Sequence, residues 1–157
     1  MDFTLTSAAF ADGQAIGPEY TCDGADRSPP LEWDGAPAST DSFVLIVDDP
    51  DAPDPAAPKM TWVHWILYNL PPSTRSLAAG VTDEDLPAGT KQGINDWGRT
   101  GYGGPCPPIG RHRYFHKLYA LDTKLDLGTP TKDQLEQAMA GHILAQTELV
   151  GTYRRGG

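Results

Sequence analysis

The sequence predicts a mainly β fold, β-rich α+β, in a single domain that covers residues 1–157. The first observation is that 17 glycines and 15 prolines divide the chain into short pieces and leave room for few long helices. The second is a series of short runs that are apolar, β-branched or aromatic, as strands are. The third is the length, which suits one domain with one hydrophobic core.

Five runs are expected to form strands, in the chain order 3–6, 43–47, 62–70, 114–121 and 149–153. Pro50 and Pro53 cannot donate to a β-ladder, so the second strand is expected to end at about Asp48 in a stiff turn. Residues 86–110 show no periodic pattern. A loop of that length is usually functional or hides an element that the pattern misses.

One amphipathic helix is expected near the end of the chain, over residues 131–146. Thr131 and Gln134 have the spacing of a capping box, and three apolar residues recur at helical spacing: Leu135, Met139 and Ile143. His142 would then lie on the surface of this helix.

The charge and hydropathy of the chain exclude several classes of partner. Twelve Lys and Arg against 21 Asp and Glu give a net charge of −9, which repels a nucleic-acid backbone. The start of the chain has no basic segment followed by an apolar run, and nowhere do eighteen apolar residues occur together. The sequence therefore predicts a cytoplasmic protein that neither binds nucleic acid nor inserts into a membrane, and it indicates no cofactor.

The two cysteines, Cys22 and Cys106, are too few and too far apart for a zinc knuckle or a CxxC redox pair. A disulfide between them would close a loop of about 85 residues and stabilise the fold by roughly 4 kcal/mol. A cytoplasmic location favours reduced thiols. The sequence leaves both states open and favours the reduced one.

Two histidines in predicted strands require polar partners. In TWVHWILYN, strand alternation places His64 on one face of an apolar strand, together with Trp62, Ile66 and Tyr68. A buried imidazole without a partner would cost about 1 to 3 kcal/mol. In GYGGPCPPIGRHRY, a Gly- and Pro-rich loop leads into a strand on which His112 and Tyr114 share a face. His116 falls on the same face, and an exposed position is expected for it.

The stretch VDDPDAPDP contains four aspartates within residues 47–55. Asp48 and Asp54 are expected to be turn acceptors or solvated charges. Asp49 and Asp51 stand at the predicted strand end, where a carboxylate can accept from an imidazole N–H and fix its tautomer.

Five motifs carry a resemblance to a known family: SPPLEW at 28–33, DPDAP at 49–53, WVHW at 62–65, GYGGPCPP at 101–108 and HRY at 112–114. In this order and spacing the chain resembles the phosphatidylethanolamine-binding protein family, in particular its bacterial and archaeal, Raf-kinase-inhibitor-like branch. The resemblance extends to the closing GHILAQTELVGTY and so covers nearly the whole chain.

The resemblance implies a large antiparallel sheet with a smaller sheet packed on it, a few short helices and one small anion-binding pocket. The implied ligand-binding residues are Asp49, Asp51, Pro53, Trp62, His64, Gly104, Cys106, His112 and Tyr114. Cys106 stands where some relatives have proline. The implied ligands are phosphate-like anions or phosphorylated headgroups, bound by a monomer or homodimer that regulates a partner kinase or protease.

The residues themselves leave several interpretations open. Donors to an anion are expected from the imidazole N–H groups, the Tyr114 hydroxyl and the backbone N–H groups of residues 103–104. Alternatives are a metal centre on His64, His112 and Asp49, or a hydrolase that uses Cys106 or a serine near His112. Both histidines would be satisfied core residues in a purely structural interpretation. Three arginines beside the loop would either attract anions or pair with the aspartates: Arg99, Arg111 and Arg113.

Overall fold

The computed structural model describes residues 2–155. The strands are β1 (Thr4–Thr6), β2 (Leu31–Asp34), β3 (Ser42–Ala52), β4 (Met60–Leu70), β5 (Ser76–Leu77), β6 (Lys91–Gln92), β7 (His112–Leu121) and β8 (Ile143–Tyr153). The helices are α1 (Lys132–Met139) and two single 3-10 turns, η1 (Pro18–Tyr20) and η2 (Asp83–Asp85).

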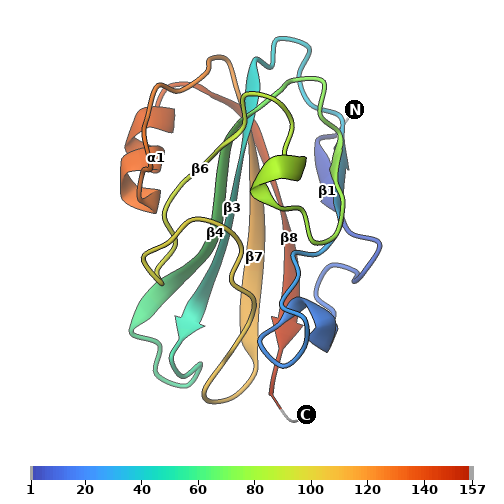
Figure 1. Cartoon of the computed structure of the whole chain (residues 1–157), viewed down its shortest axis with the longest axis vertical. Helices are drawn as coiled ribbons and strands as arrows, with labels where there is room; N and C mark the ends of the chain where they lie inside the picture. The colour runs from blue at the N-terminus through green and yellow to red at the C-terminus, as the bar shows by residue number, and fades with distance from the viewer. Residues whose placement is uncertain (1, 156–157) are drawn as a thin grey trace.

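The strands form two antiparallel sheets, as expected. The larger has the order β6-β4-β3-β7-β8, and the smaller has the order β1-β2-β5. The long strands β3, β4, β7 and β8 run side by side through the molecule, with β1 on one flank and α1 on the other (Figure 1). A mainly β fold with a large and a small sheet is therefore confirmed.

Each face of the large sheet contributes to a separate hydrophobic cluster. On one face, which we call the sandwich face, Phe43 and Leu45 of β3 pack with Leu31 and Trp33 of the small sheet. On the opposite face, the helix face, the apolar side chains of β3, β4 and α1 meet: Val44, Ile46, Ile66, Leu135 and Met139. Burying apolar surface on both sides explains why β3 and β4 read as continuous apolar runs.

A β-bulge in β4 determines where His64 points. Val47 pairs with Trp65, but the next residue of β3, Asp48, pairs with Val63, so His64 has no partner position on β3. Trp65 packs on the sandwich face and Val63 on the helix face, although strand alternation would place them together. The predicted grouping of His64 with Ile66 is therefore wrong. A bulge re-aims a side chain in this way, and here it leaves His64 on the sandwich face.

The second predicted strand continues farther than expected. β3 runs to Ala52, so the expectation of a turn at about Asp48 is wrong. Its pairing with β4 is irregular between Asp49 and Ala52. Pro50 lies in this irregular segment, where a residue that cannot donate to the ladder is tolerated.

The C-terminal helix is shorter than predicted. The capping box of Thr131 and Gln134 is present, but α1 ends at Met139 and Ile143 begins β8. Gly141 has a φ of +82°, a left-handed conformation that ends helices and is easily adopted only by glycine. His142 therefore lies in the connection, where it is exposed and pairs with Asp122.

One end of the large sheet gathers the segments that form the site. β3 ends there, β4 and β7 begin there, and the arrow of β8 points to the same end (Figure 1). The loop between residues 92 and 112 also reaches this end. Of the helices in the described part of the chain, none is long and apolar enough to cross a membrane.

Candidate functional site

A cavity of about 400 Å³ opens at this end of the sandwich face. β3 and the turn after it contribute Asp49, Ala52 and Pro53, and β4 contributes Met60, Trp62 and His64. The long loop contributes Trp97, Cys106, Pro107 and Pro108, and β7 contributes His112 and Tyr114. Both predicted histidines therefore line the same cavity, although they are far apart in the sequence.

His112 is held between two acceptors. Its Nδ1 lies 2.6 Å from Asp49 Oδ2, and its Nε2 lies 2.8 Å from the carbonyl oxygen of Ile109. Each ring nitrogen therefore faces an oxygen of the protein, so both are engaged in hydrogen bonds. Burial raises the pKa of the Asp49 carboxyl, and the hydrogen bond from His112 opposes that rise. The pair leaves His112 with no N–H for a ligand.

His64 has one engaged nitrogen. Its Nδ1 lies 2.7 Å from the carbonyl oxygen of Gly103, so Nδ1 donates to that oxygen. In the neutral ring, Nε2 then has a lone pair and acts as an acceptor. Burial lowers the pKa of His64 to about 4, and the bond to Gly103 only partly opposes this. His64 is therefore neutral at pH 7, and no described residue bonds its Nε2.

Tyr114 supplies a buried donor that has no partner. The residue is 1% exposed, and its hydroxyl has no hydrogen-bond partner among the described residues. Its ring lies edge-on to His64, with the centroids 5.2 Å apart, and stacks beside His112 at 6.3 Å. Burial raises the pKa of the phenol, so the group remains protonated and able to donate. An unsatisfied buried hydroxyl in a cavity wall is a reason to expect a ligand there.

Aromatic and proline side chains form the walls of the cavity. Trp97 lies edge-on to His64 and to Trp62, with ring centroids 5.1 and 5.5 Å away. Met60 and Trp97 are 47% and 42% exposed at the mouth. The cavity therefore combines a polar floor with an apolar rim, as small-molecule sites usually do.

Comparison with known proteins places the chain in a family. A family model described as phosphatidylethanolamine-binding protein matches residues 6–154. The chain belongs to the phosphatidylethanolamine-binding protein family. It is 52% identical to a UPF0098 protein of Methanothermobacter thermautotrophicus over 155 residues, which cover 97% of this chain and 99% of that protein.

Two solved structures of the phosphatidylethanolamine-binding protein family are similar to this chain over nearly all of its length. One is the homologue CT736 of Chlamydia trachomatis, with a TM-score of 0.89, 44% identity and coverage of 98% of this chain and 97% of that one. The other is YbcL of E. coli, described as a new member of the mammalian family, with a TM-score of 0.87, 32% identity and coverage of 98% and 99%.

Seven of the nine ligand-binding residues that the family resemblance implied line the cavity, and two do not. Asp51 is not among the lining residues. Its carboxylate accepts from the Arg113 guanidinium at 2.9 and 3.0 Å and from the Arg113 backbone N–H at 2.9 Å. That ion pair lowers the pKa of Asp51 and ties the end of β3 to β7. For Arg113, pairing with the aspartates is therefore the interpretation that the structure supports.

Gly104 also lies outside the cavity wall. Its backbone N–H donates to Asp26 Oδ1 at 2.8 Å, and the N–H of Gly103 donates to the carbonyl oxygen of His64 at 3.1 Å. The expected backbone donors to an anion are thus engaged elsewhere. A Cβ at residue 104 would lie 2.4 Å from the carbonyl oxygen of Tyr20, which explains the glycine.

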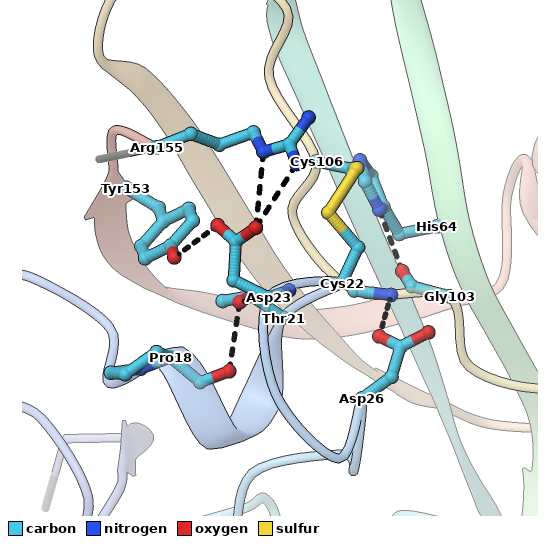
Figure 2. Close-up of a disulfide and its surroundings, with 11 residues drawn as sticks. Pro18, Thr21, Cys22, Asp23, Asp26, His64, Gly103, Cys106, Tyr153 and Arg155 are labelled. Carbon is cyan, nitrogen blue, oxygen red and sulfur yellow. Dashed lines mark hydrogen bonds and ion pairs between the residues drawn. A yellow bond between two sulfur atoms is a disulfide. The ribbon is translucent and has the colours of Figure 1, made fainter.

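The structure joins Cys22 and Cys106 in a disulfide, whereas the sequence favoured reduced thiols. Figure 2 shows the bond beside the His64–Gly103 hydrogen bond. It links the loop after η1 to the loop that forms one wall of the cavity. The N–H of Cys22 also donates to the carbonyl oxygen of Pro105 at 3.1 Å. In this state Cys106 has no thiolate, the nucleophile that the hydrolase alternative requires.

Two polar residues beside the site differ from expectation. Asp48 is 1% exposed and accepts from Lys117 at 3.1 Å and Lys132 at 2.7 Å on the helix face, so it is neither a turn acceptor nor a solvated charge. His116 is also 1% exposed, with Nδ1 placed 3.2 Å from the Leu149 carbonyl oxygen. The expected exposed position of His116 is wrong. Asp54, by contrast, accepts from a backbone N–H in its turn, as expected.

The long loop supplies wall residues that sequence reasoning missed. Trp97, Pro107 and Pro108 line the cavity, and so do Ala52 at the end of β3 and Met60 at the start of β4. A tryptophan in a polar loop, NDWGR, was the signal available in the sequence. Within residues 2–155, no group of three His, Cys, Asp or Glu side chains is placed to hold a metal ion. Both nitrogens of His112 are engaged by protein oxygens, which does not suit the metal alternative.

Proposed function

We propose that this protein binds a small anion, a phosphate-like group or a phosphorylated headgroup, in the cavity between β3, β4 and β7. The observation that supports the proposal most directly is the Tyr114 hydroxyl, which is buried in the cavity wall without a protein partner. An anionic oxygen in the cavity would accept from this hydroxyl. Family membership supports a ligand-binding role in general terms.

The surrounding groups suit such a ligand. The His112 ring lies beside the Tyr114 ring and is held there by its bond to Asp49. His64 contributes a ring nitrogen without a partner, and the apolar rim of Met60 and Trp97 would contact an organic substituent. A hydrogen bond to a charged group contributes about 1.5 to 3 kcal/mol, so a site with one or two of them is expected to bind with millimolar to micromolar affinity.

The experiment is an NMR titration of the protein with inorganic phosphate and with phosphorylethanolamine. Saturable shifts of the His64 and His112 ring signals are expected. Tyr114→Phe should weaken binding about tenfold or more, because it removes the hydroxyl that would donate to the anion. Tyr102→Phe is the matched control, because the Tyr102 hydroxyl already donates to the carbonyl oxygen of Tyr20 at 2.7 Å. Wild-type protein that shows no shift with either anion would overturn the proposal.

Regulation of a partner kinase or protease, a monomeric or homodimeric state and a location in the cytoplasm belong to the proposal as well. Regulation of a partner rests on the family resemblance, and the location rests on the lack of an export signal or long apolar run in the given sequence. Thiol trapping in intact cells would test the location, because the Cys22–Cys106 disulfide is expected to be reduced in an ordinary cytoplasm.

A further inference from the structure

The cavity has both a donor and an acceptor without a partner in the described part of the chain. The Tyr114 hydroxyl is a donor without a partner, and His64 Nε2 is an acceptor without a partner among the described residues. Other polar groups of the lining are engaged within the protein: both ring nitrogens of His112 face protein oxygens, and the Asp49 carboxylate is bonded to His112 at 2.6 Å and to the Asp51 N–H at 2.7 Å. The indole N–H groups of Trp62 and Trp97 are further donors in the lining without a bond to a described residue, and like Tyr114 they call for an acceptor. A ligand that satisfies the cavity must therefore both accept and donate.

On the basis of the proposed function, we propose that the cavity selects an oxyacid monoanion that still has one O–H, such as a singly protonated phosphate monoester, over a fully ionised anion. One ligand oxygen accepts from Tyr114, and the acidic O–H donates to His64 Nε2. A fully ionised anion has no hydrogen to donate, so one of its oxygens would face the His64 lone pair. Leaving that acceptor without a hydrogen bond in the complex discriminates against the second kind of ligand.

The alternative, in which His64 becomes a donor, is opposed by its surroundings. Burial holds the pKa of His64 at about 4, far below neutral pH. The titratable side chains near the His64 ring come from two neighbouring strands. Asp48 and Asp49 lie on β3, and His112, Tyr114 and His116 lie on β7. The long loop presents Trp97, on which Arg99 stacks, and the Gly103 carbonyl oxygen. Asp48 favours the protonated ring, but His116 and His112 oppose it, so the acceptor form persists.

The test compares two ligands that have similar shapes and, at pH 5, the same charge. Phosphorylethanolamine carries a phosphate monoester whose second pKa is about 6, so at pH 5 the group has one negative charge and one O–H. Ethanolamine O-sulfate has one negative charge and no O–H at any pH used. At pH 5 we expect the phosphate ester to bind at least tenfold more tightly. Between pH 6 and 8 its affinity should fall at least tenfold, while the affinity of the sulfate ester should stay within threefold.

The sulfate ester controls for titration of the protein, because any ionisation of His112 or Asp49 affects both ligands. Equal affinities at pH 5, or tighter phosphate binding at pH 8, would overturn the selection for an O–H while leaving anion binding intact. Failure of both ligands to bind would overturn the proposed function itself.

A measurement on wild-type protein avoids any variant that fails to fold. The ¹⁵N shifts of the His64 ring should show a hydrogen on Nδ1 and none on Nε2 in the free protein at pH 7. Bound phosphorylethanolamine should shift Nε2 toward the hydrogen-bonded range without moving the Nδ1 hydrogen. A hydrogen on Nε2 in the free protein would overturn the inference.

Discussion

Replacement of Tyr114 by phenylalanine should stabilise the empty protein and weaken its anion binding. The substitution removes one hydroxyl from a side chain that is 1% exposed and keeps the ring contacts with His64 and His112. A buried polar group without a partner costs about 1 to 3 kcal/mol. Water in the cavity would hydrogen-bond the hydroxyl and reduce that cost, so removing the hydroxyl is expected to raise the unfolding free energy by about 1 kcal/mol.

Guanidinium denaturation with and without 50 mM phosphate measures both effects. Tyr114→Phe should have the higher midpoint without phosphate and should gain less from its addition, because ligand stabilisation follows RT ln(1 + [L]/Kd). The control Tyr102→Phe loses a hydroxyl that is bonded to a carbonyl oxygen, so it should lose about 1 kcal/mol and respond to phosphate like wild type. A Tyr114→Phe protein that is less stable than wild type by 1 kcal/mol or more would refute the reasoning.

Three further predictions concern the stability of the site. Reduction of the disulfide, or replacement of both Cys22 and Cys106 by serine, should lower the unfolding free energy by up to about 4 kcal/mol, because the bond restrains a loop of 84 residues in the unfolded chain. Added reductant should have no effect on the serine variant. Asp49→Asn removes the charge from a buried ion pair and should cost about 3 kcal/mol in urea denaturation, and a loss below 1 kcal/mol would contradict that pairing. Burial lowers the pKa of His64 and His116 from 6.5 to about 4, so below pH 6.5 the unfolded chain takes up protons that the folded protein does not. The unfolding free energy should therefore fall by about 1.4 kcal/mol per pH unit for each histidine between pH 6.5 and 4. Equal urea midpoints at pH 6.5 and 4.5 would exclude this.

The sequence, with the family resemblance, predicted seven of the residues that line the cavity, but not how His64 is aimed there. His112 and Tyr114 follow strand alternation and share a face as predicted. His64 required a bulge, which arises from the pairing of β4 with β3 and leaves no local signal in the run of apolar residues. A bulge is an extra residue in one strand relative to its partner strand. Counting alternate residues along β4 alone therefore cannot reveal it.

The C-terminal error has a different cause. Ile143 lies four residues after Met139, a spacing that fits a helix, but the same residue fits the start of an apolar strand. Gly141 between them was the available stop signal, and its left-handed φ is what ends α1. β8 is then paired along its whole length with β7, which is a long-range contact that no window of the sequence contains.

The hydrogen-bond assignments at the site were also beyond the sequence. Residue types indicate donors and acceptors, but they do not show which are already engaged within the protein. The Gly104 N–H bonds Asp26, which is 78 residues away, and His112 is saturated by Asp49 and Ile109. Because of these contacts, several of the predicted donors are engaged within the protein, and His64 offers an acceptor in place of a donor.

The bond between Cys22 and Cys106 also determines what a protease can achieve. A single cut in the exposed η2 segment, Asp83–Asp85, would separate the chain into two peptides that remain covalently attached to each other. One peptide would hold β3 and β4 and the other β7, so both sides of the cavity would stay in one particle. Such a nicked molecule would migrate as two bands on a gel only after treatment with a reductant, and its ligand affinity before that treatment would report whether the intact backbone matters to the site.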